Sequence, residues 1–121
     1  MTKRILVVED HEDNRQILRD LLANSEFDII EAEDGEQAVL AATRYRPDLI
    51  LMDIQLPLLD GYEATRRIKA DPALKDIPVI VVTSYALSGD EQRAYAAGCD
   101  GYVAKPYDPI ALLETLRRFL H

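Results

Sequence analysis

The sequence has a single cysteine, Cys99, and no tryptophan among its 121 residues. One thiol cannot form an internal disulfide, so a secreted scaffold held together by disulfides is excluded. The uninterrupted apolar runs are far too short to cross a bilayer, and no basic and apolar leader precedes the first predicted strand. We therefore expect a soluble, cytoplasmic protein, in which Cys99 is an inert and partly buried residue.

Basic residues are also scarce, because 14 lysines and arginines stand against 22 aspartates and glutamates, and the formal net charge is −8. No basic cluster offsets this excess, since the pairs Arg66-Arg67 and Arg117-Arg118 are typical of solvated helix flanks. A surface of this sign repels phosphate backbones and anionic lipids. The composition thus predicts no direct binding to nucleic acid or to membranes.

What the sequence does have is a series of short apolar runs rich in Ile, Val and Leu. They occupy residues 5–8, 48–52, 77–82 and, more weakly, 101–104, and a further short strand is predicted at 27–31. Because the runs do not alternate with polar residues, they indicate parallel strands buried on both faces. Helical patterns lie between them. The chain is therefore predicted to form one α/β domain over residues 1–121, with helices on both faces of a parallel sheet.

The predicted helices carry apolar stripes and marked ends. We expect each stripe to face the core, and a polar cap or a proline to set each boundary. The stripes of the first and last helices are Ile17, Leu18, Leu21 and Leu22, and Ile110, Leu113, Leu116 and Leu120. The starting signals are Asp34 with Gln37, Ser88 with Glu91, and Asp108 before Pro109, and Pro47 and Pro72 follow the second and third helices.

Polar residues interrupt this apolar background where the predicted strands end. They are Glu9-Asp10 after the first strand, Asp53 after the third, Thr83 after the fourth and Lys105 after the fifth. The carboxyl ends of parallel strands share one edge, where open α/β sheets bind their ligands. We therefore expect three carboxylates, a hydroxyl and an ammonium group to converge there.

Three crowded carboxylates repel one another unless a cation neutralises them or a pKa rises. Oxygen ligands on short loops favour Mg²⁺, and a carboxylate beside Mg²⁺ can attack a phosphoryl group to give an acyl phosphate. Lys105 and the Thr83 hydroxyl would then balance the charge of the phosphoryl oxygens. Asp53 is the best candidate nucleophile, because it ends the central strand.

The sequence resembles the receiver (response regulator) domain of bacterial two-component signalling in four segments: ILVVEDHEDNR, PDLILMDIQLPLLDGYEATRRIK, IPVIVVTSYA and GYVAKPYD. The resemblance covers essentially the whole chain, and a small departure is Glu9, where aspartate is also frequent. It implies a CheY-like, flavodoxin-like, doubly wound parallel sheet of five strands in the order 2-1-3-4-5, with five helices in three layers. It also implies a signalling phosphoacceptor that is not an enzyme, apart from its own phosphotransfer and slow autodephosphorylation.

Carried over to this sequence, the resemblance makes Asp53 the phosphoacceptor, and Thr83 and Lys105 the ligands of the phosphoryl oxygens. The implied metal is Mg²⁺, which Mn²⁺ can replace. Its implied ligands are Asp10, Asp53, the backbone carbonyl of Gln55 and, through water, Glu9.

The resemblance further implies a phosphoryl donor and a switch. The donor would be a histidine kinase or a histidine phosphotransfer protein. On phosphorylation, Thr83 would move toward the phosphoryl oxygens, and the ring of Tyr102 would turn from a solvent-facing to a buried position. The alternative is that Tyr102 is a half-buried core residue that does not move. A downstream target protein would read this change on the face made by the helix at 88–98, the fifth strand and the helix at 109–120.

Two other interpretations stay open from the residues alone. A phosphatase or mutase of the haloacid-dehalogenase type also forms an aspartyl phosphate, but its nucleophile follows the first strand and a second aspartate comes two residues later, where this chain has Gln55. A degenerate receiver or a flavodoxin-like binding module would act only by protein contact. The intact set of strand-end residues disfavours a degenerate receiver, and the lack of a glycine-rich cofactor cradle disfavours a flavodoxin-like module. The sequence does not choose between a stand-alone regulator and a part of a larger protein.

Overall fold

Strands and helices alternate along the chain in the computed structural model, which describes residues 2–23, 25–83, 89–105 and 107–120. The strands are β1 (Lys3–Val8), β2 (Phe27–Ala32), β3 (Leu49–Asp53), β4 (Val79–Thr83) and β5 (Gly101–Ala104). The helices are α1 (Glu12–Ala23), α2 (Gly35–Tyr45), α3 (Gly61–Ala70), α4 (Asp90–Ala96) and α5 (Pro109–Phe119).

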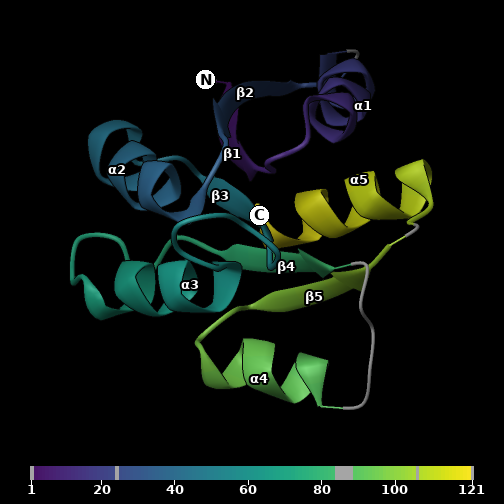
Figure 1. Ribbon diagram of the computed structural model, residues 1–121. Coiled ribbons are helices and arrows are strands. Elements are labelled where there is room, and N and C mark those ends of the chain that lie inside the picture. Colours follow the sequence, from purple (N-terminus) through teal and green to yellow (C-terminus); the bar gives the residue numbers. More distant parts are fainter. Residues whose placement is uncertain (1, 24, 84–88, 106, 121) are drawn as a thin grey trace.

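The strands form one parallel sheet in the order β2-β1-β3-β4-β5, and helices cover both of its faces (Figure 1). α1 and α5 lie on one face, and α2, α3 and α4 lie on the other. The doubly wound, three-layered fold predicted from the sequence is therefore confirmed. None of the helices within the described ranges is long and apolar enough to cross a membrane.

The parallel register brings the carboxyl ends of the strands to one edge of the sheet. Asp53 pairs with Val82, and Thr83 pairs with Ala104. The arrowheads of β4 and β5 accordingly point the same way, toward the right of Figure 1. Asp53 and Thr83 are the last residues of β3 and β4, whereas the predicted strands stopped one residue earlier. The difference arises because both residues continue the strand pairing.

Apolar side chains fill the space on each side of the sheet. β3 and β4 are buried along their whole length, as expected for central strands covered on both faces. On one face, α2, α3 and α4 contribute mainly alanines to the core. On the other face, α1 and α5 contribute the leucines Leu18, Leu22, Leu112 and Leu116. The helices thus hold the strand ends in place by burying one apolar face each.

Two residues of the predicted apolar stripes do not reach the core. Ile17 of α1 is 56% exposed and Ile110 of α5 is 67% exposed. In α5 the fully buried residues are Leu112 and Leu116, one turn apart, and Ile110 lies two residues before Leu112. On a helix with 3.6 residues per turn, that offset places Ile110 on the side away from the sheet. Ile17 is similarly turned away from Leu18 and lines a cavity described below.

Aspartates start three helices. The carboxylate of Asp34 accepts from the backbone N–H of Gln37 at 2.8 Å, and Asp108 accepts from the backbone N–H of Ala111 at 3.3 Å, so both predicted caps are confirmed. Asp60, which the sequence analysis did not single out, caps α3 in the same way. Ser88, the cap predicted for the fourth helix, lies outside the described residues.

α4 is shorter than the predicted helix at 88–98. It follows Gly89, which has a φ of 95°, and it ends before Gly98, which has a φ of 107°. Glycine adopts such left-handed conformations at little cost, and they interrupt an α-helix. The surface that α4 presents is therefore smaller than the sequence pattern suggested.

The end of α2 gives a prediction about stability. Arg46 caps this helix in the left-handed conformation, with a φ of 46° and a ψ of 64°. That conformation costs a residue with a side chain more than it costs glycine. Arg46→Gly should therefore raise the free energy of unfolding by about 0.5 to 1 kcal/mol, measured by urea denaturation. Arg46→Ala is the control, and an equal gain in that variant would contradict the backbone explanation.

Candidate functional site

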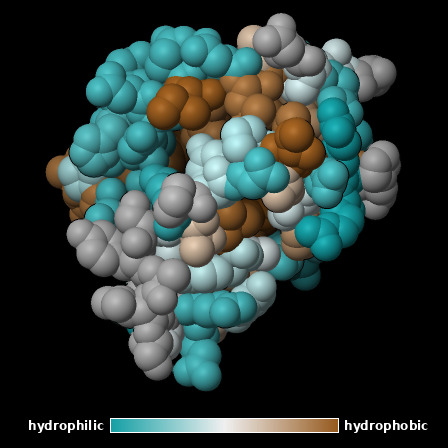
Figure 2. Space-filling model, turned by 90° about the vertical axis from the view of Figure 1, so that its right-hand side faces the viewer, coloured by the Kyte–Doolittle hydropathy of each residue, from teal (hydrophilic) through white to brown (hydrophobic). Residues whose placement is uncertain are grey.

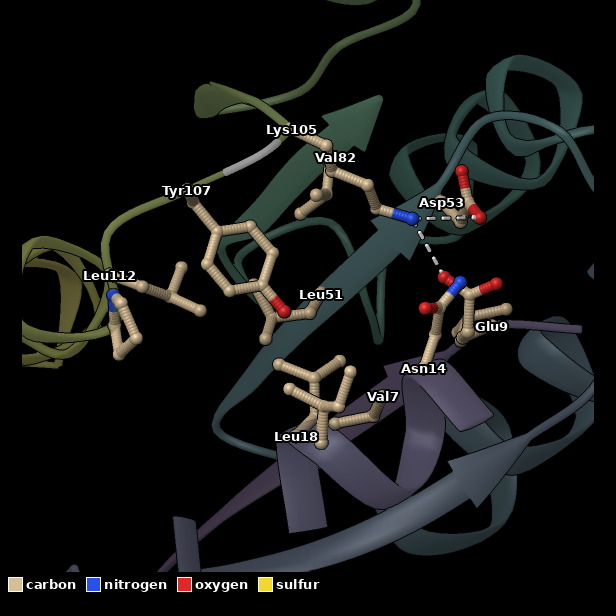
Figure 3. Close-up of a pocket in the computed structure, with 13 residues that line it drawn as sticks. Val7, Glu9, Asn14, Leu18, Leu51, Asp53, Val82, Lys105, Tyr107 and Leu112 are labelled. Atoms are coloured by element: carbon tan, nitrogen blue, oxygen red, sulfur yellow. Dashed lines mark hydrogen bonds and ion pairs between the residues drawn. The ribbon is translucent and has the colours of Figure 1, made fainter. Parts of the chain in front are cut away.

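The strand-end residues predicted from the sequence meet at the carboxyl edge of the sheet. Glu9 follows β1, Asp53 ends β3 and Lys105 follows β5. The Nζ atom of Lys105 lies 2.8 Å from Glu9 Oε2 and 3.4 Å from Asp53 Oδ2, and Figure 3 marks both contacts with dashed lines. One ammonium group thus bridges two carboxylates that come from different strands.

Thr83 belongs to the same edge. It ends β4, which lies between β3 and β5, and it is buried. The backbone N–H of Lys105 donates to the Thr83 carbonyl oxygen at 2.7 Å. This hydrogen bond fixes the point from which the Lys105 side chain extends toward Glu9 and Asp53. Thr83 and Lys105, the predicted hydroxyl and ammonium residues, are therefore joined by a backbone hydrogen bond at the paired ends of β4 and β5.

The acid pair continues into the loop before α1. The side chain of Asp10 is 27% exposed, compared with 3% for Glu9. His11, which the sequence analysis did not consider, places its Nδ1 atom 3.0 Å from Asp10 Oδ1 and 3.3 Å from Glu9 Oε1. The hydrogen bond to Glu9 and the charge of Asp10 raise the pKa of His11. Its position directly after the acid pair was the available signal in the sequence.

The pKa values follow the positions of these charges. Burial and the negative charge of Glu9 raise the pKa of Asp53 from 3.8 to about 6. Burial, the largest single influence, would raise the pKa of Glu9, but the hydrogen bonds with Lys105 and Asp53, the charge of Lys105 and the backbone N–H of His11 together outweigh it and lower this pKa to about 2. Glu9 has the shorter contact with the ammonium group and gains more from it. The electrostatic cost of crowding therefore falls mainly on Asp53.

Gln55 lies just beyond Asp53 in the loop after β3. Its backbone N–H donates to Asp53 Oδ1 at 3.3 Å, and its side chain is exposed. This arrangement suits a residue that takes part in the site only through its backbone. The contact also restrains the Asp53 carboxylate on the side away from Lys105, whose Nζ contacts Oδ2.

Tyr102 lies away from the acids, in the middle of β5. Its ring is half-buried and packs against the core under α2, α3 and α4, so the expectation of a solvent-facing ring is not met in this structure. Tyr102 also lines a groove beside β5. This groove has a volume of about 320 Å³ and is also lined by Tyr95 and Phe119.

An apolar cavity opens beside the charged edge, between α1 and α5. Its volume is about 480 Å³, and Glu9, Asp53 and Lys105 lie at one end of it. Figure 2 faces this side of the molecule and shows apolar surface gathered in a hollow among hydrophilic surroundings. The walls labelled in Figure 3 include Val7, Leu18, Leu51, Val82, Tyr107 and Leu112. The sequence pattern did not predict the cavity.

The oxygen atoms at this edge fit a hard divalent cation. Glu9, Asp10 and His11 offer ligand atoms that lie within 4.8 Å of one another, and Asp53 stands beside Glu9 with a raised pKa. A cation here would turn the repulsion among the carboxylates into attraction. Carboxylate and carbonyl oxygens are the ligands that Mg²⁺ prefers, and it needs only one or two carboxylates. The arrangement can therefore hold such an ion beside Asp53, the candidate nucleophile.

The raised pKa of Asp53 predicts a gain in stability when its charge is removed. In the absence of divalent cations, Asp53→Asn should raise the free energy of unfolding at pH 7.5 by about 1 to 3 kcal/mol. The ionised carboxylate opposes folding because its pKa is higher in the folded chain than in the unfolded chain. The destabilisation by the ionised Asp53 carboxylate appears as the pH rises from about 4 to about 6. The stability gained by Asp53→Asn should therefore be smaller at pH 4.5 than at pH 7.5.

Urea denaturation in EDTA at the two pH values measures this difference. An asparagine variant that is no more stable than the unsubstituted protein at pH 7.5 would contradict the assigned repulsion. Asp13→Asn, which changes an exposed carboxylate in the first turn of α1, is the control for the loss of one negative charge.

Comparisons with known proteins agree over nearly the full chain. The family described as "Response regulator receiver domain" matches residues 5–117. The polar-differentiation response regulator DivK of Brucella ovis is 43% identical over 120 residues, which cover 99% of this chain and 98% of that protein. DivK of Brucella melitensis gives the same values.

Solved structures show the same likeness. The receiver domain of the sensor histidine kinase PA1611 from Pseudomonas aeruginosa PAO1, with magnesium coordinated in its active site cleft, is 39% identical with a TM-score of 0.92. That match covers 99% of this chain and 98% of the other. The chemotaxis protein CheY4 of Vibrio cholerae is 28% identical with a TM-score of 0.92, and the match covers 99% of this chain and all of CheY4. With the fold and the charged edge already in agreement, these matches show that the chain belongs to the response regulator receiver domain family.

Proposed function

We propose that Asp53 of this receiver domain accepts a phosphoryl group from a phosphohistidine of a histidine kinase or a histidine phosphotransfer protein. The observation that carries the proposal is the bridge from Lys105 to Glu9 and Asp53. It sets a positive charge beside the buried acid whose pKa is raised. The higher basicity makes Asp53 the better nucleophile of the two buried acids, and Lys105 stands where an incoming phosphoryl group brings negative charge.

In the proposed step, an Asp53 carboxylate oxygen attacks phosphorus. The bond between phosphorus and the imidazole nitrogen of the donor breaks, and the imidazole leaves with the electron pair. Lys105 and the Thr83 hydroxyl then bind the phosphoryl oxygens. Hydrolysis of the aspartyl phosphate restores the carboxylate. The protein thus acts as a signalling phosphoacceptor, which we propose is not an enzyme with a separate substrate.

The proposal includes Mg²⁺, which Mn²⁺ can replace, held by Asp10, Asp53 and the backbone carbonyl of Gln55. When bound, the ion supplies positive charge for the phosphoryl oxygens. Glu9 is assigned a role through water, because its carboxylate is buried and already paired with Lys105. The oxygen-rich edge supports this assignment, as does the likeness to the Pseudomonas receiver domain with magnesium in its cleft.

The donor protein is proposed to approach over the rim between α1 and α5. Asp53 is only 8% exposed, and the cavity between these helices leads to it. Ile17 on α1 is exposed and lines this cavity, and the exposed Ile110 on α5 directly follows Pro109, which also lines it. Exposed apolar residues beside a concave site favour contact with a partner protein, because the contact removes them from water.

The proposed location is the cytoplasm. The single cysteine, Cys99, is buried, and burial raises the pKa of its thiol to about 11. Such a thiol is protonated at neutral pH and a poor nucleophile, in line with the inert residue predicted. The partners proposed here, which carry phosphohistidine, fit the same compartment.

The downstream target is proposed to bind the face formed by α4, β5 and α5, which corresponds to the predicted segments 88–98, 101–104 and 109–120. The groove lined by Tyr95, Tyr102 and Phe119 lies on this face. Thr83 pairs with the end of β5, so a movement of its side chain toward a phosphoryl group leaves space near that strand. Tyr102, already half-buried, is placed to complete its burial in that space and so reshape the groove.

Phosphorylation at Asp53 predicts a simple mass change. Incubation with Mg²⁺ and acetyl phosphate should add one phosphoryl group to the intact chain, and Asp53→Asn should abolish the addition. Asp13→Asn should label normally, because this exposed carboxylate lies outside the site. Stoichiometric labelling of the Asp53→Asn protein at neutral pH would refute the assignment, and release of free phosphate at high turnover would favour a phosphatase.

The switch predicts a change far from the phosphoryl group. Beryllofluoride with Mg²⁺ mimics the phosphoryl group, and it should shift the amide resonances of α4, β5 and α5 and change the side-chain order of Tyr102. Thr83→Ala should blunt these shifts while leaving much of the labelling intact. Shifts confined to the loops around Asp53, with α4 and Tyr102 unchanged, would show that this mechanism is not used.

A further inference from the structure

Arg15, near the start of α1, is a charged residue that the fold buries. It is 7% exposed, and it is the only lysine or arginine classed as buried within the described residues. A buried guanidinium group is stable only when its N–H donors and its charge are satisfied. The partners of Arg15 therefore show what its burial achieves.

The guanidinium group links four segments around the acid pair. Its Nη1 atom donates to the backbone carbonyl oxygen of Glu9 at 2.8 Å, a fully buried hydrogen bond. Its Nε atom lies 3.2 Å from Glu31 Oε1 at the end of β2, and its Nη2 atom lies 3.2 Å from Glu33 Oε1 in the next loop. The Nη2 atom also pairs with Glu12 in the first turn of α1. α1 lies alongside β2 in Figure 1, in keeping with these contacts.

The hydrogen bond to Glu9 acts on the peptide that joins Glu9 to Asp10. Because a peptide unit is planar, holding its carbonyl oxygen also fixes the direction in which the next residue leaves the strand. On the other side, the backbone N–H of Glu9 donates to Ala32 of β2 at 3.1 Å. The two bonds together clamp the backbone from which the Glu9 and Asp10 carboxylates project.

We propose that Arg15 is a positioning residue for the metal site, acting through the backbone of Glu9 and Asp10. The inference rests on the proposed function, since it concerns the Mg²⁺ held by Asp10 and Asp53. A metal ion tolerates little displacement of its ligands, and residues that orient ligands contribute strongly to metal affinity. Arg15 therefore sets the affinity for Mg²⁺ without touching the ion.

The sign of the effect separates positioning from simple electrostatics. Arg15 carries a positive charge near the acid pair, and it also neutralises Glu12, Glu31 and Glu33. If charge alone mattered, Arg15→Gln would leave the region more negative and Mg²⁺ would bind more tightly. If Arg15 acts by positioning, Arg15→Gln should bind Mg²⁺ more weakly, because the peptide between Glu9 and Asp10 is no longer held in place.

Arg19 supplies a matched control. It lies one turn later on α1 and pairs with two of the same carboxylates, those of Glu12 and Glu31. Within the described part of the chain its guanidinium group contacts Glu12, Gln16 and Glu31 and not the Glu9 carbonyl, and its side chain is 33% exposed. Arg19→Gln thus removes a positive charge from the same network while leaving the clamp on the acid pair intact.

The test is calorimetric titration with MgCl₂ at pH 7.5, well below the unfolding temperature of every variant. Arg15→Gln should bind Mg²⁺ about tenfold more weakly than the unsubstituted protein, Arg15→Lys should lie between them, and Arg19→Gln should stay within about twofold. Asp10→Asn, which removes a proposed ligand, is the reference for a damaged site. Labelling of Arg15→Gln by acetyl phosphate should recover at saturating Mg²⁺, because Asp53 and Lys105 are in place.

Equal or tighter Mg²⁺ binding by Arg15→Gln, with the unsubstituted protein binding normally, would overturn the inference alone and leave Arg15 a stabilising residue. If Arg15→Gln does not fold, Arg15→Lys decides in the same way. No Mg²⁺ binding by the unsubstituted protein would overturn the proposed metal site and this inference with it.

Discussion

Negative charge crowded at one edge of a parallel sheet is the constraint on which the rest of the structure depends. Glu9, Asp10 and Asp53 stand together, and one ammonium group, that of Lys105, bridges two of them. A folded chain keeps such an arrangement only if other interactions outweigh the repulsion. Here β3 and β4 are buried along their length between two helical layers, and that burial holds the strand ends in place.

The same crowding connects stability with function. Groups that lower the stability of the folded state are common where a protein binds ligands, because a bound ligand can remove the unfavourable interaction. In the function proposed above, a divalent cation at this edge would remove repulsion, and a phosphoryl group on Asp53 would bring new oxygens within reach of Lys105 and Thr83. Because Thr83 pairs with the end of β5, a change at the edge can reach the face of α4 and α5 through neighbouring strands.

Local patterns in the sequence predicted most of the fold and the strand-end residues of the site. Non-alternating apolar runs identify buried parallel strands, and Asp34 and Asp108 act through nearby backbone N–H groups, so both are readable from short segments. Other features depend on segments that come together only on folding. The exposure of Ile17 and Ile110, the cavity between α1 and α5, and the contact of Arg15 with the Glu9 carbonyl all depend on packing that a short segment does not encode.

Asp53 carries most of the electrostatic cost of the crowded carboxylates. Titration of its side-chain carboxyl carbon by ¹³C NMR, in the absence of divalent cations, tests this claim directly. We predict a midpoint near pH 6, because burial and the charge of Glu9 raise the pKa of Asp53 to about 6. A midpoint at or below about pH 4, the range of an unperturbed aspartate, would contradict it.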